Sequence, residues 1–192
     1  MALLTVTSRS LLRDGVADLP DQMWGFYPSS SSNNDDSDTL GDFTHRLRST
    51  TSRVHFAKRG SPLFIRHQAS PKRSSPSSTL SRLDPASQVE TIHLNPEYQG
   101  KIGGRNVFVV DDCTTYGLSF GAAAAFLRRA GARSVTGVAL GKFGNQFHHF
   151  DITLKSDPFA PVGHGNYQCR VASSSQGITN ADAQATLRSI IA

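Results

Sequence analysis

Two adjacent carboxylates and a short run of small, hydroxyl-bearing residues stand together in the middle of the chain. Asp111 and Asp112 are followed closely by Thr115, Gly117 and Ser119. Neighbouring carboxylates repel each other where they are buried, so they need a partner such as a diol or a bound cation. A glycine lets the backbone approach a ligand, and hydroxyls can donate hydrogen bonds to phosphate oxygens. These residue types at this spacing favour the binding of a sugar phosphate.

The pattern around these residues predicts the elements that position them. Residues 107–110 form a continuous apolar run (VFVV), which is typical of a strand buried on both faces. Residues 119–130 have apolar side chains at helical spacing, and Gly131 stands where a left-handed helix end is favoured. A second apolar run at 135–140 completes a βαβ unit with an expected right-handed crossover. Ligands of parallel sheets bind at the carboxyl ends of the strands, which places the predicted site in the loop at 111–119.

The same stretch resembles the signature of type I phosphoribosyltransferases, which binds 5-phosphoribosyl diphosphate (PRPP). That signature has four apolar residues, two acidic residues, two variable residues and then Thr-Thr-Gly-x-Thr/Ser; the chain reads VFVV, DD, CT and TYGLS. The match continues through AGA at residues 130–132. Tyr116 departs from the pattern, because its phenol stands in place of a threonine and could narrow the phosphate pocket or donate its own hydroxyl. Within the family, the chain most resembles the competence-associated, amidophosphoribosyltransferase-like branch.

The resemblance implies an α/β fold in which helices flank a central, mainly parallel sheet, with a small hood and a long flexible loop. It implies one domain over residues 1–192. The core would lie at about 20–144, the flexible loop at about 67–87 and the hood with the C-terminal region at about 145–192.

By resemblance, Asp111 and Asp112 are the catalytic carboxylates. They would hold the ribose hydroxyls of PRPP, directly or through Mg²⁺, which makes them the expected metal-binding residues as well; one of them could help to deprotonate the acceptor. The 5′-phosphate would bind five consecutive residues: Thr115, Tyr116, Gly117, Leu118 and Ser119. Free amides and the dipole at a helix N-terminus attract phosphate. Mg²⁺ prefers oxygen ligands, which ribose, pyrophosphate and water would complete.

A hydroxyl- and amide-rich loop at residues 28–34 follows an expected strand at 23–27. By composition alone, such a tract is a flexible linker as readily as a binding site. By position it matches the loop that binds pyrophosphate in the resembled family. This match assigns pyrophosphate binding to Ser29, Ser30 and Ser31.

No periodicity is visible over residues 67–87, and an irregular stretch of this length is usually disordered or a functional lid. In the resembled family, a flexible loop at this place closes over PRPP, brings basic residues to pyrophosphate and excludes water from the reacting ribosyl group. Lys72 and Arg73 are the candidates for this role. The alternative is that they are solvated surface charges.

Three phenylalanines and two histidines are crowded into residues 143–151. Phe143 and Phe147 are candidates for a hood that stacks on a planar acceptor, although they could equally pack a small satellite core. A metal site at His148, His149 and Asp151 is less favoured, because adjacent side chains of a strand point to opposite faces.

Three other elements are expected between the loops, and a fourth at the end of the chain. Strands are predicted at 62–66 and 88–94, and a helix should place Leu40, Phe43 and Leu47 on one face. A closing amphipathic helix is expected after residue 179.

The composition sets limits on the class of protein. With 192 residues, 38% of them apolar, the chain suits one ordinary domain. The net charge of +5 suits anionic ligands, but by itself does not establish nucleic-acid binding. Cys113 and Cys169 form no disulfide framework, which favours a reducing cytoplasm. No apolar run is long enough to span a membrane, and no secretory signal is recognised.

The sequence therefore predicts a phosphoribosyltransferase that uses PRPP and Mg²⁺, transfers the 5-phosphoribosyl group to a nitrogenous base or amine and releases pyrophosphate, with a homodimer as one option. The alternative is a catalytically inactive module that binds PRPP or a nucleotide and has a protein or nucleic-acid partner. A third option is an unrelated α/β protein with a chance similarity in one loop.

Overall fold

A computed structural model describes residues 2–15, 19–31, 39–51, 60–70 and 82–177, with single positions at 185, 188 and 189. Lys72 and Arg73, most of the flexible loop expected at 67–87 and most of the closing helix lie outside these residues.

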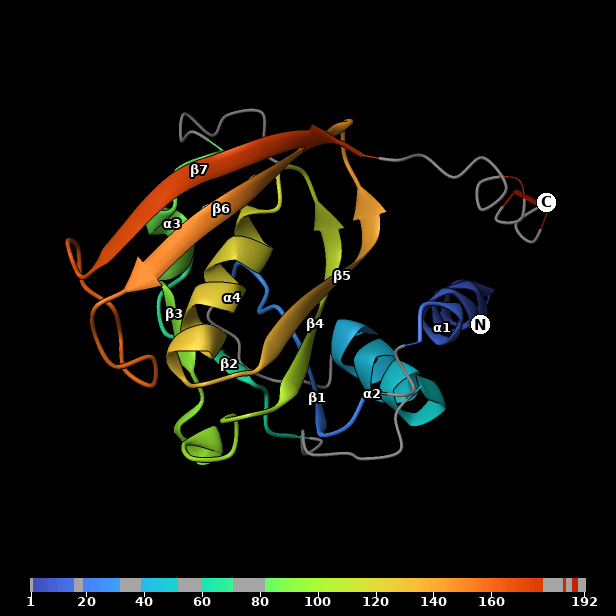
Figure 1. Ribbon diagram of the computed structural model, residues 1–192, viewed down its shortest axis with the longest axis horizontal. Helices are drawn as coiled ribbons and strands as arrows, with labels where there is room; N and C mark the ends of the chain where they lie inside the picture. Colours follow the sequence, from blue (N-terminus) through green and yellow to red (C-terminus); the bar gives the residue numbers. More distant parts are fainter. Residues whose placement is uncertain are drawn as a thin grey trace.

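A three-stranded parallel sheet forms the centre of the molecule (Figure 1). Its order is β1 (Gln22–Phe26), β4 (Asn106–Thr114) and β5 (Ser134–Lys142), with β4 in the middle. The register pairs Val107 with Met23 on one side and with Val135 on the other. All three strands therefore end at the same edge. The expected α/β class, the strand at 23–27 and the parallel βαβ pairing are confirmed.

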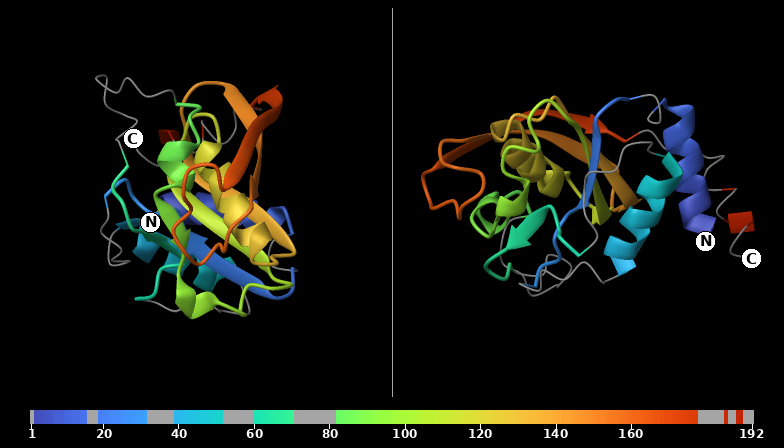
Figure 2. Two further views of the ribbon diagram at one scale, coloured as in Figure 1. Left: turned by 90° about the vertical axis from the view of Figure 1, so that its left-hand side faces the viewer. Right: turned by 90° about the horizontal axis from the view of Figure 1, so that it is seen from below.

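Helices cover both faces of this sheet (Figure 2). Val107 and Val109 belong to the apolar cluster that contains α4 (Leu118–Arg129). Phe108 and Val110 belong to the other cluster, with side chains of α1 (Ala2–Arg13) and α2 (Thr39–Thr51). Alternate side chains of a strand point to opposite faces, so burial on both sides explains why this strand is apolar at every position.

The second face has an aromatic centre. The rings of Trp24 and Phe108 stack with their centroids 4.5 Å apart. Leu40, Phe43 and Leu47 of α2 pack in the same cluster, so the predicted amphipathic helix is confirmed.

A short antiparallel pair, β2 (Phe64–Arg66) and β3 (Ile92–Leu94), forms a separate sheet. The strand expected at 62–66 is confirmed, whereas the one expected at 88–94 is wrong over its first half. A helical turn, α3 (Ala86–Val89), stands there instead, and η2 (Pro96–Tyr98) follows β3. Val89 and Ile92 are both buried in the core, and residues three apart share a face in a helical turn, whereas an alternating strand would point them to opposite faces.

A long antiparallel ribbon of β6 (Gln146–Leu154) and β7 (Tyr167–Gln176) crosses over α4 (Figure 1). Phe150, Ile152 and Leu154 of β6 join the same core cluster as α4. The contact is close, because a Cβ on Gly121 would stand 2.7 Å from the Cβ of Phe150. The ribbon occupies the segment in which the hood was expected. None of the helices in the described ranges is long and apolar enough to cross a membrane.

Candidate functional site

The connection between β4 and α4 is shorter than the sequence suggests. β4 remains paired with β5 as far as Thr114, which is opposite Lys142, so Asp111 and Asp112 lie in the strand and not in the loop. Since α4 begins at Leu118, the loop is reduced to residues 115–117. The predicted loop at 111–119 is therefore too long at both ends, because continued pairing with β5 extends the strand.

Gly117 makes this tight turn possible. It has a φ of +88°, a left-handed conformation that side chains disfavour. Its amide donates to Oγ1 of Thr114 at 3.1 Å, which closes the turn. A Cβ at this position would also stand 2.6 Å from Cζ of Phe147 on β6. Both the backbone and the neighbouring ring therefore require glycine.

The two carboxylates have different surroundings. Asp111 is 8% exposed, and Oδ2 accepts a hydrogen bond of 2.8 Å from the Ser119 hydroxyl, while Oδ1 accepts one of 3.0 Å from the Asp112 amide. Burial raises the pKa of the Asp111 carboxyl to about 7, and the charge of Asp112 acts in the same direction. Asp112 itself is exposed, and its Oδ1 accepts from the Cys113 amide at 2.6 Å. Asp111 is thus fixed in place, and Asp112 is accessible to a ligand.

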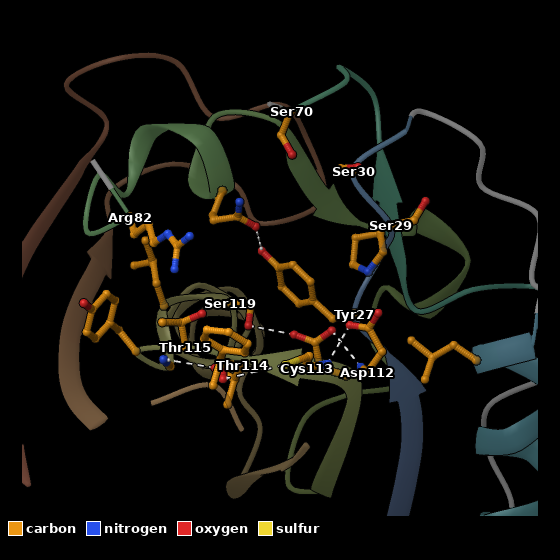
Figure 3. Close-up of a pocket in the computed structure, with 18 of the residues that line it drawn as sticks. Tyr27, Ser29, Ser30, Ser70, Arg82, Asp112, Cys113, Thr114, Thr115 and Ser119 are labelled. Atoms are coloured by element: carbon orange, nitrogen blue, oxygen red, sulfur yellow. Dashed lines mark hydrogen bonds between the residues drawn. The ribbon is translucent and has the colours of Figure 1, made fainter. Parts of the chain in front are cut away.

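Both carboxylates line a cavity of about 670 Å³ at the carboxyl end of the sheet (Figure 3). The loop after β1 contributes Ser29 and Ser30, and the end of β4 with the start of α4 contributes every residue from Asp111 to Ser119. The Ser31 hydroxyl lies 2.9 Å from that of Ser29, but Ser31 is not among the lining residues. The ribose, phosphate and pyrophosphate residues named from the sequence therefore converge on one cavity, apart from Ser31 and the basic pair outside the described ranges.

Arg66 is a cavity residue that sequence reasoning missed. Its side chain is only 1% exposed; Nη1 donates to Oγ1 of Thr91 at 2.6 Å and Nη2 to the Pro28 carbonyl at 3.3 Å. Burial lowers the pKa of the guanidinium, and Tyr27 and Asp111 act in the opposite direction. A positive charge in the cavity wall suits an anionic ligand. The available signal was a charged residue that ends an apolar strand, PLFIR.

Other cavity residues were missed because they lie far apart in the sequence. The Tyr27 hydroxyl donates to Oε1 of Gln88 at 2.7 Å, which joins the end of β1 to α3. Ser70 and Arg82 line the cavity from either side of residues 71–81. Arg82 stands beside the cavity in Figure 3.

Tyr116 is held against the ribbon. Its ring stacks on the ring of His148, with centroids 5.1 Å apart and planes inclined by 29°. The His148 amide also donates to the Tyr116 carbonyl at 3.0 Å. Because Tyr116 also lines the cavity, its ring connects the cavity wall to β6.

Lys142, the last residue of β5, donates hydrogen bonds that hold the loop at 115–117 in place. Its Nζ donates to the Thr115 carbonyl, to the Phe143 carbonyl at 2.7 Å and to the Gly144 carbonyl at 3.1 Å. One ammonium group therefore joins the loop at 115–117 to the turn before β6.

The two predicted acceptor-binding phenylalanines occupy different places. Phe143 lines the cavity and is 68% exposed, whereas Phe147 packs on Gly117 and is not among the lining residues. The weaker hypothesis of a metal site in this segment gains no support. Asp151 pairs with Arg170 at 2.7 Å, and within the described ranges no group of three or more His, Cys, Asp or Glu residues could hold a metal ion.

Mg²⁺ fits the donor set at the cavity only together with a ligand. Asp111 and Asp112 offer the hard oxygen atoms that this cation prefers, but two carboxylates already engaged by Ser119 and by backbone amides do not complete six-fold coordination. The oxygens of a bound sugar phosphate would have to supply the rest.

Comparison with known proteins gives distant similarity only. No protein-family model matches the chain, and no curated protein sequence matches it. Among solved structures, the chain is similar to a hypoxanthine phosphoribosyl transferase of Trypanosoma cruzi, with a TM-score of 0.42 and 13% identity over 75% of each chain. It is also similar to a glutamine mutant from an analysis of an invariant aspartic acid in HPRTs, with a TM-score of 0.41 and 13% identity over 78% of this chain and 80% of that one. At these values, function has to be judged from the cavity itself.

Proposed function

We propose that the protein is a phosphoribosyltransferase that binds PRPP with Mg²⁺, transfers the 5-phosphoribosyl group to a nitrogen acceptor and releases pyrophosphate. One observation carries the proposal. The Asp111–Asp112 pair and the start of α4 line a single cavity of about 670 Å³ with Ser29, Ser30 and Arg66. A volume of this size is within the usual range for small-ligand sites.

Different residues of the cavity would contact different parts of PRPP. The exposed Asp112 carboxylate would accept hydrogen bonds from the ribose hydroxyls, with Asp111 beside it. Residues 115–119 would hold the 5′-phosphate through the Thr115 hydroxyl and the amides at the start of α4, because the first amides of a helix have no partner within the helix. The Gly117 amide is already engaged by Thr114, and the Ser119 hydroxyl would donate to the phosphate only by releasing Asp111. Mg²⁺, bound through Asp112 and the oxygens of the ligand, would offset negative charge on the leaving pyrophosphate.

The other end of the cavity would hold the pyrophosphate. Ser29 and Ser30 would donate hydrogen bonds, and the buried Arg66 would supply positive charge and keep the Pro28 carbonyl in place. Catalysis would then come mainly from positioning and charge stabilisation. Cys113 and Cys169 are both free, which is compatible with the reducing cytoplasm that we propose as its location.

Release of pyrophosphate from PRPP tests this function. The protein is incubated with PRPP, Mg²⁺ and a panel of nitrogenous bases and amines, and pyrophosphate is measured. Release that depends on an acceptor supports the proposal. Hydrolysis without an acceptor, or no release with any acceptor although PRPP binds, contradicts the transferase activity.

A binding module without turnover is the second candidate, and one arrangement favours it. Phe147 was expected to contact the acceptor, but its ring packs against Gly117 instead. The Tyr116 ring is likewise stacked on His148. In this alternative PRPP or a nucleotide binds and serves as a signal to a partner. Tight PRPP binding with no pyrophosphate release from any acceptor would select it.

A further inference from the structure

Two short segments of the chain are rich in positive charge. The whole chain has 20 Lys and Arg against 15 Asp and Glu, a net charge of +5. Residues 101–105 and 128–133 hold five basic residues and no acidic one. We call the five residues the basic end: Lys101, Arg105, Arg128, Arg129 and Arg133.

The two segments lie against each other. The Gly104 amide donates to the Gly131 carbonyl at 2.8 Å, and the Arg133 amide donates to the Arg105 carbonyl at 2.8 Å. Since β4 and β5 begin directly after them, the basic end lies at the amino end of the sheet, opposite the edge at which these strands finish (Figure 1). These five charges therefore lie together at one end of the molecule, away from the cavity.

Local contacts engage Arg105 and Arg129. The side chains are exposed except that of Arg105, which is partly buried and lies 4.0 Å from the Asp21 carboxylate. Nε of Arg129 donates to the Ser156 carbonyl at 3.3 Å. Arg128 and Arg129 also offset the negative end of the α4 dipole, but that effect explains only these two.

The surface between the basic side chains is backbone. Gly103 and Gly104 have open space where a Cβ would stand, and a Cβ on Gly131 would meet the Gly103 Cα at 3.4 Å. A phosphodiester chain can approach such a surface closely. Arginine suits this partner because its guanidinium can donate two parallel hydrogen bonds to one phosphate.

The same end lacks the apolar side chains that insert into a membrane interface. The large hydrophobic residues that are exposed in the described ranges all lie outside the two segments: Leu12, Leu19, Leu83, Phe143 and Val171. This distribution favours nucleic acid over a lipid surface.

We propose that the basic end binds the phosphate backbone of a nucleic-acid duplex without reading its sequence. Contacts to phosphates position a protein on a duplex but do not distinguish bases. The proposal is independent of the proposed enzymatic activity, because the cavity lies at the other end of the sheet.

Fluorescence anisotropy of a labelled DNA duplex tests this binding. Titrations at several salt concentrations should give a plot of log K against log salt with a slope of about −3 to −4, since each neutralised phosphate contributes about −0.9. In the triple variant Lys101→Gln, Arg128→Gln and Arg133→Gln, the slope should become shallower by about 2.7. A control triple variant on α1 and α2 removes the same charge far from the basic end: Arg9→Gln, Arg13→Gln and Arg46→Gln.

The control should keep the wild-type slope. An equal loss in both triple variants would overturn the proposal, because binding would then follow the net charge alone. No binding to DNA at low salt, or binding to phosphatidylserine vesicles but not to DNA, would overturn it as well. Circular dichroism checks that both variants are folded, and a PRPP titration of the first variant shows separately whether the cavity is intact.

Discussion

The Ser119 hydroxyl donates a hydrogen bond of 2.8 Å to the buried Oδ2 of Asp111. This contact joins the first turn of α4 to the end of β4, the two elements that meet at the cavity. It holds the Asp111 carboxyl in one orientation while the Ser119 hydroxyl stands beside the proposed phosphate site. Because the Ser119 hydroxyl lies next to both the Asp111 carboxyl and the proposed phosphate site, its removal should weaken ligand binding.

Replacing Ser119 tests this connection. Ser119→Ala removes the donor from a buried carboxyl and one contact of the phosphate loop, so PRPP affinity should fall about tenfold, equivalent to about 1.4 kcal/mol. Ser119→Thr keeps the hydroxyl and should bind PRPP nearly as well as the wild type. Calorimetric titration measures both. Equal weakening by the two substitutions would show that the hydroxyl is not the important feature.

Stability should depend on pH through Asp111. Burial raises the pKa of its carboxyl to about 7 from an unfolded value near 4, so the folded state holds a proton that the unfolded state loses. The free energy of unfolding should therefore fall as the pH rises from about 4 to about 7, and level off above that. The fall should be about 1 to 3 kcal/mol, since one pKa unit corresponds to about 1.4 kcal/mol.

Asp111→Asn should remove this dependence, and Asp112→Asn should only reduce it, because the charge of Asp112 contributes to the raised pKa of Asp111. Urea unfolding at pH 5 and pH 8 measures the difference. If the loss of stability between these two values is the same in the wild type and in Asp111→Asn, another group is responsible.

Gly117→Ala should be strongly destabilising. A side chain at a φ of +88° costs about 1 to 2 kcal/mol, and the new Cβ would also displace the Phe147 ring. Gly104→Ala is the control, because its φ is +74° but the space around it is open. Thermal unfolding should show the larger loss for Gly117→Ala. Similar losses for the two variants would mean that the contact with Phe147 is relieved without cost.

Lys142→Met should weaken PRPP binding more than it changes folding. The ammonium group holds three carbonyls, on the proposed phosphate-binding loop at 115–117 and on the turn before β6. Without it the loop must be ordered on binding, so the affinity should fall about fivefold. Lys155→Met is a charge-matched control on an exposed residue after β6, and it should leave the affinity unchanged. An equal effect of both variants would point to the net charge.

The central βαβ unit could be predicted from the sequence because its signals are local. The VFVV run shows a strand buried on both faces, and Gly131, with a φ of +89°, ends the following helix as expected. The end of β4 was misplaced because pairing with β5 carries the strand through Asp111 and Asp112 to Thr114, and that pairing is not local.

Elements that depend on distant partners could not be predicted. β7 reads YQCRVASSSQ, in which apolar residues alternate only as far as Val171, and its polar, exposed second half is a strand because β6 pairs with it. Arg66 likewise joins the cavity only through contacts with Thr91 and Pro28. Phe147 was expected to contact the acceptor, but its ring packs against Gly117, which has no side chain to exclude it.

Calorimetric titration of PRPP with Mg²⁺ tests the central claim most directly. The wild type is compared with the double variant Asp111→Ala and Asp112→Ala, and with the control variant Asp151→Ala, which removes a carboxylate from the ribbon. We predict saturable binding by the wild type and by the control, and its loss in the double variant. Failure of the folded wild type to bind PRPP, or equal binding by the double variant, would contradict a PRPP site at the end of β4.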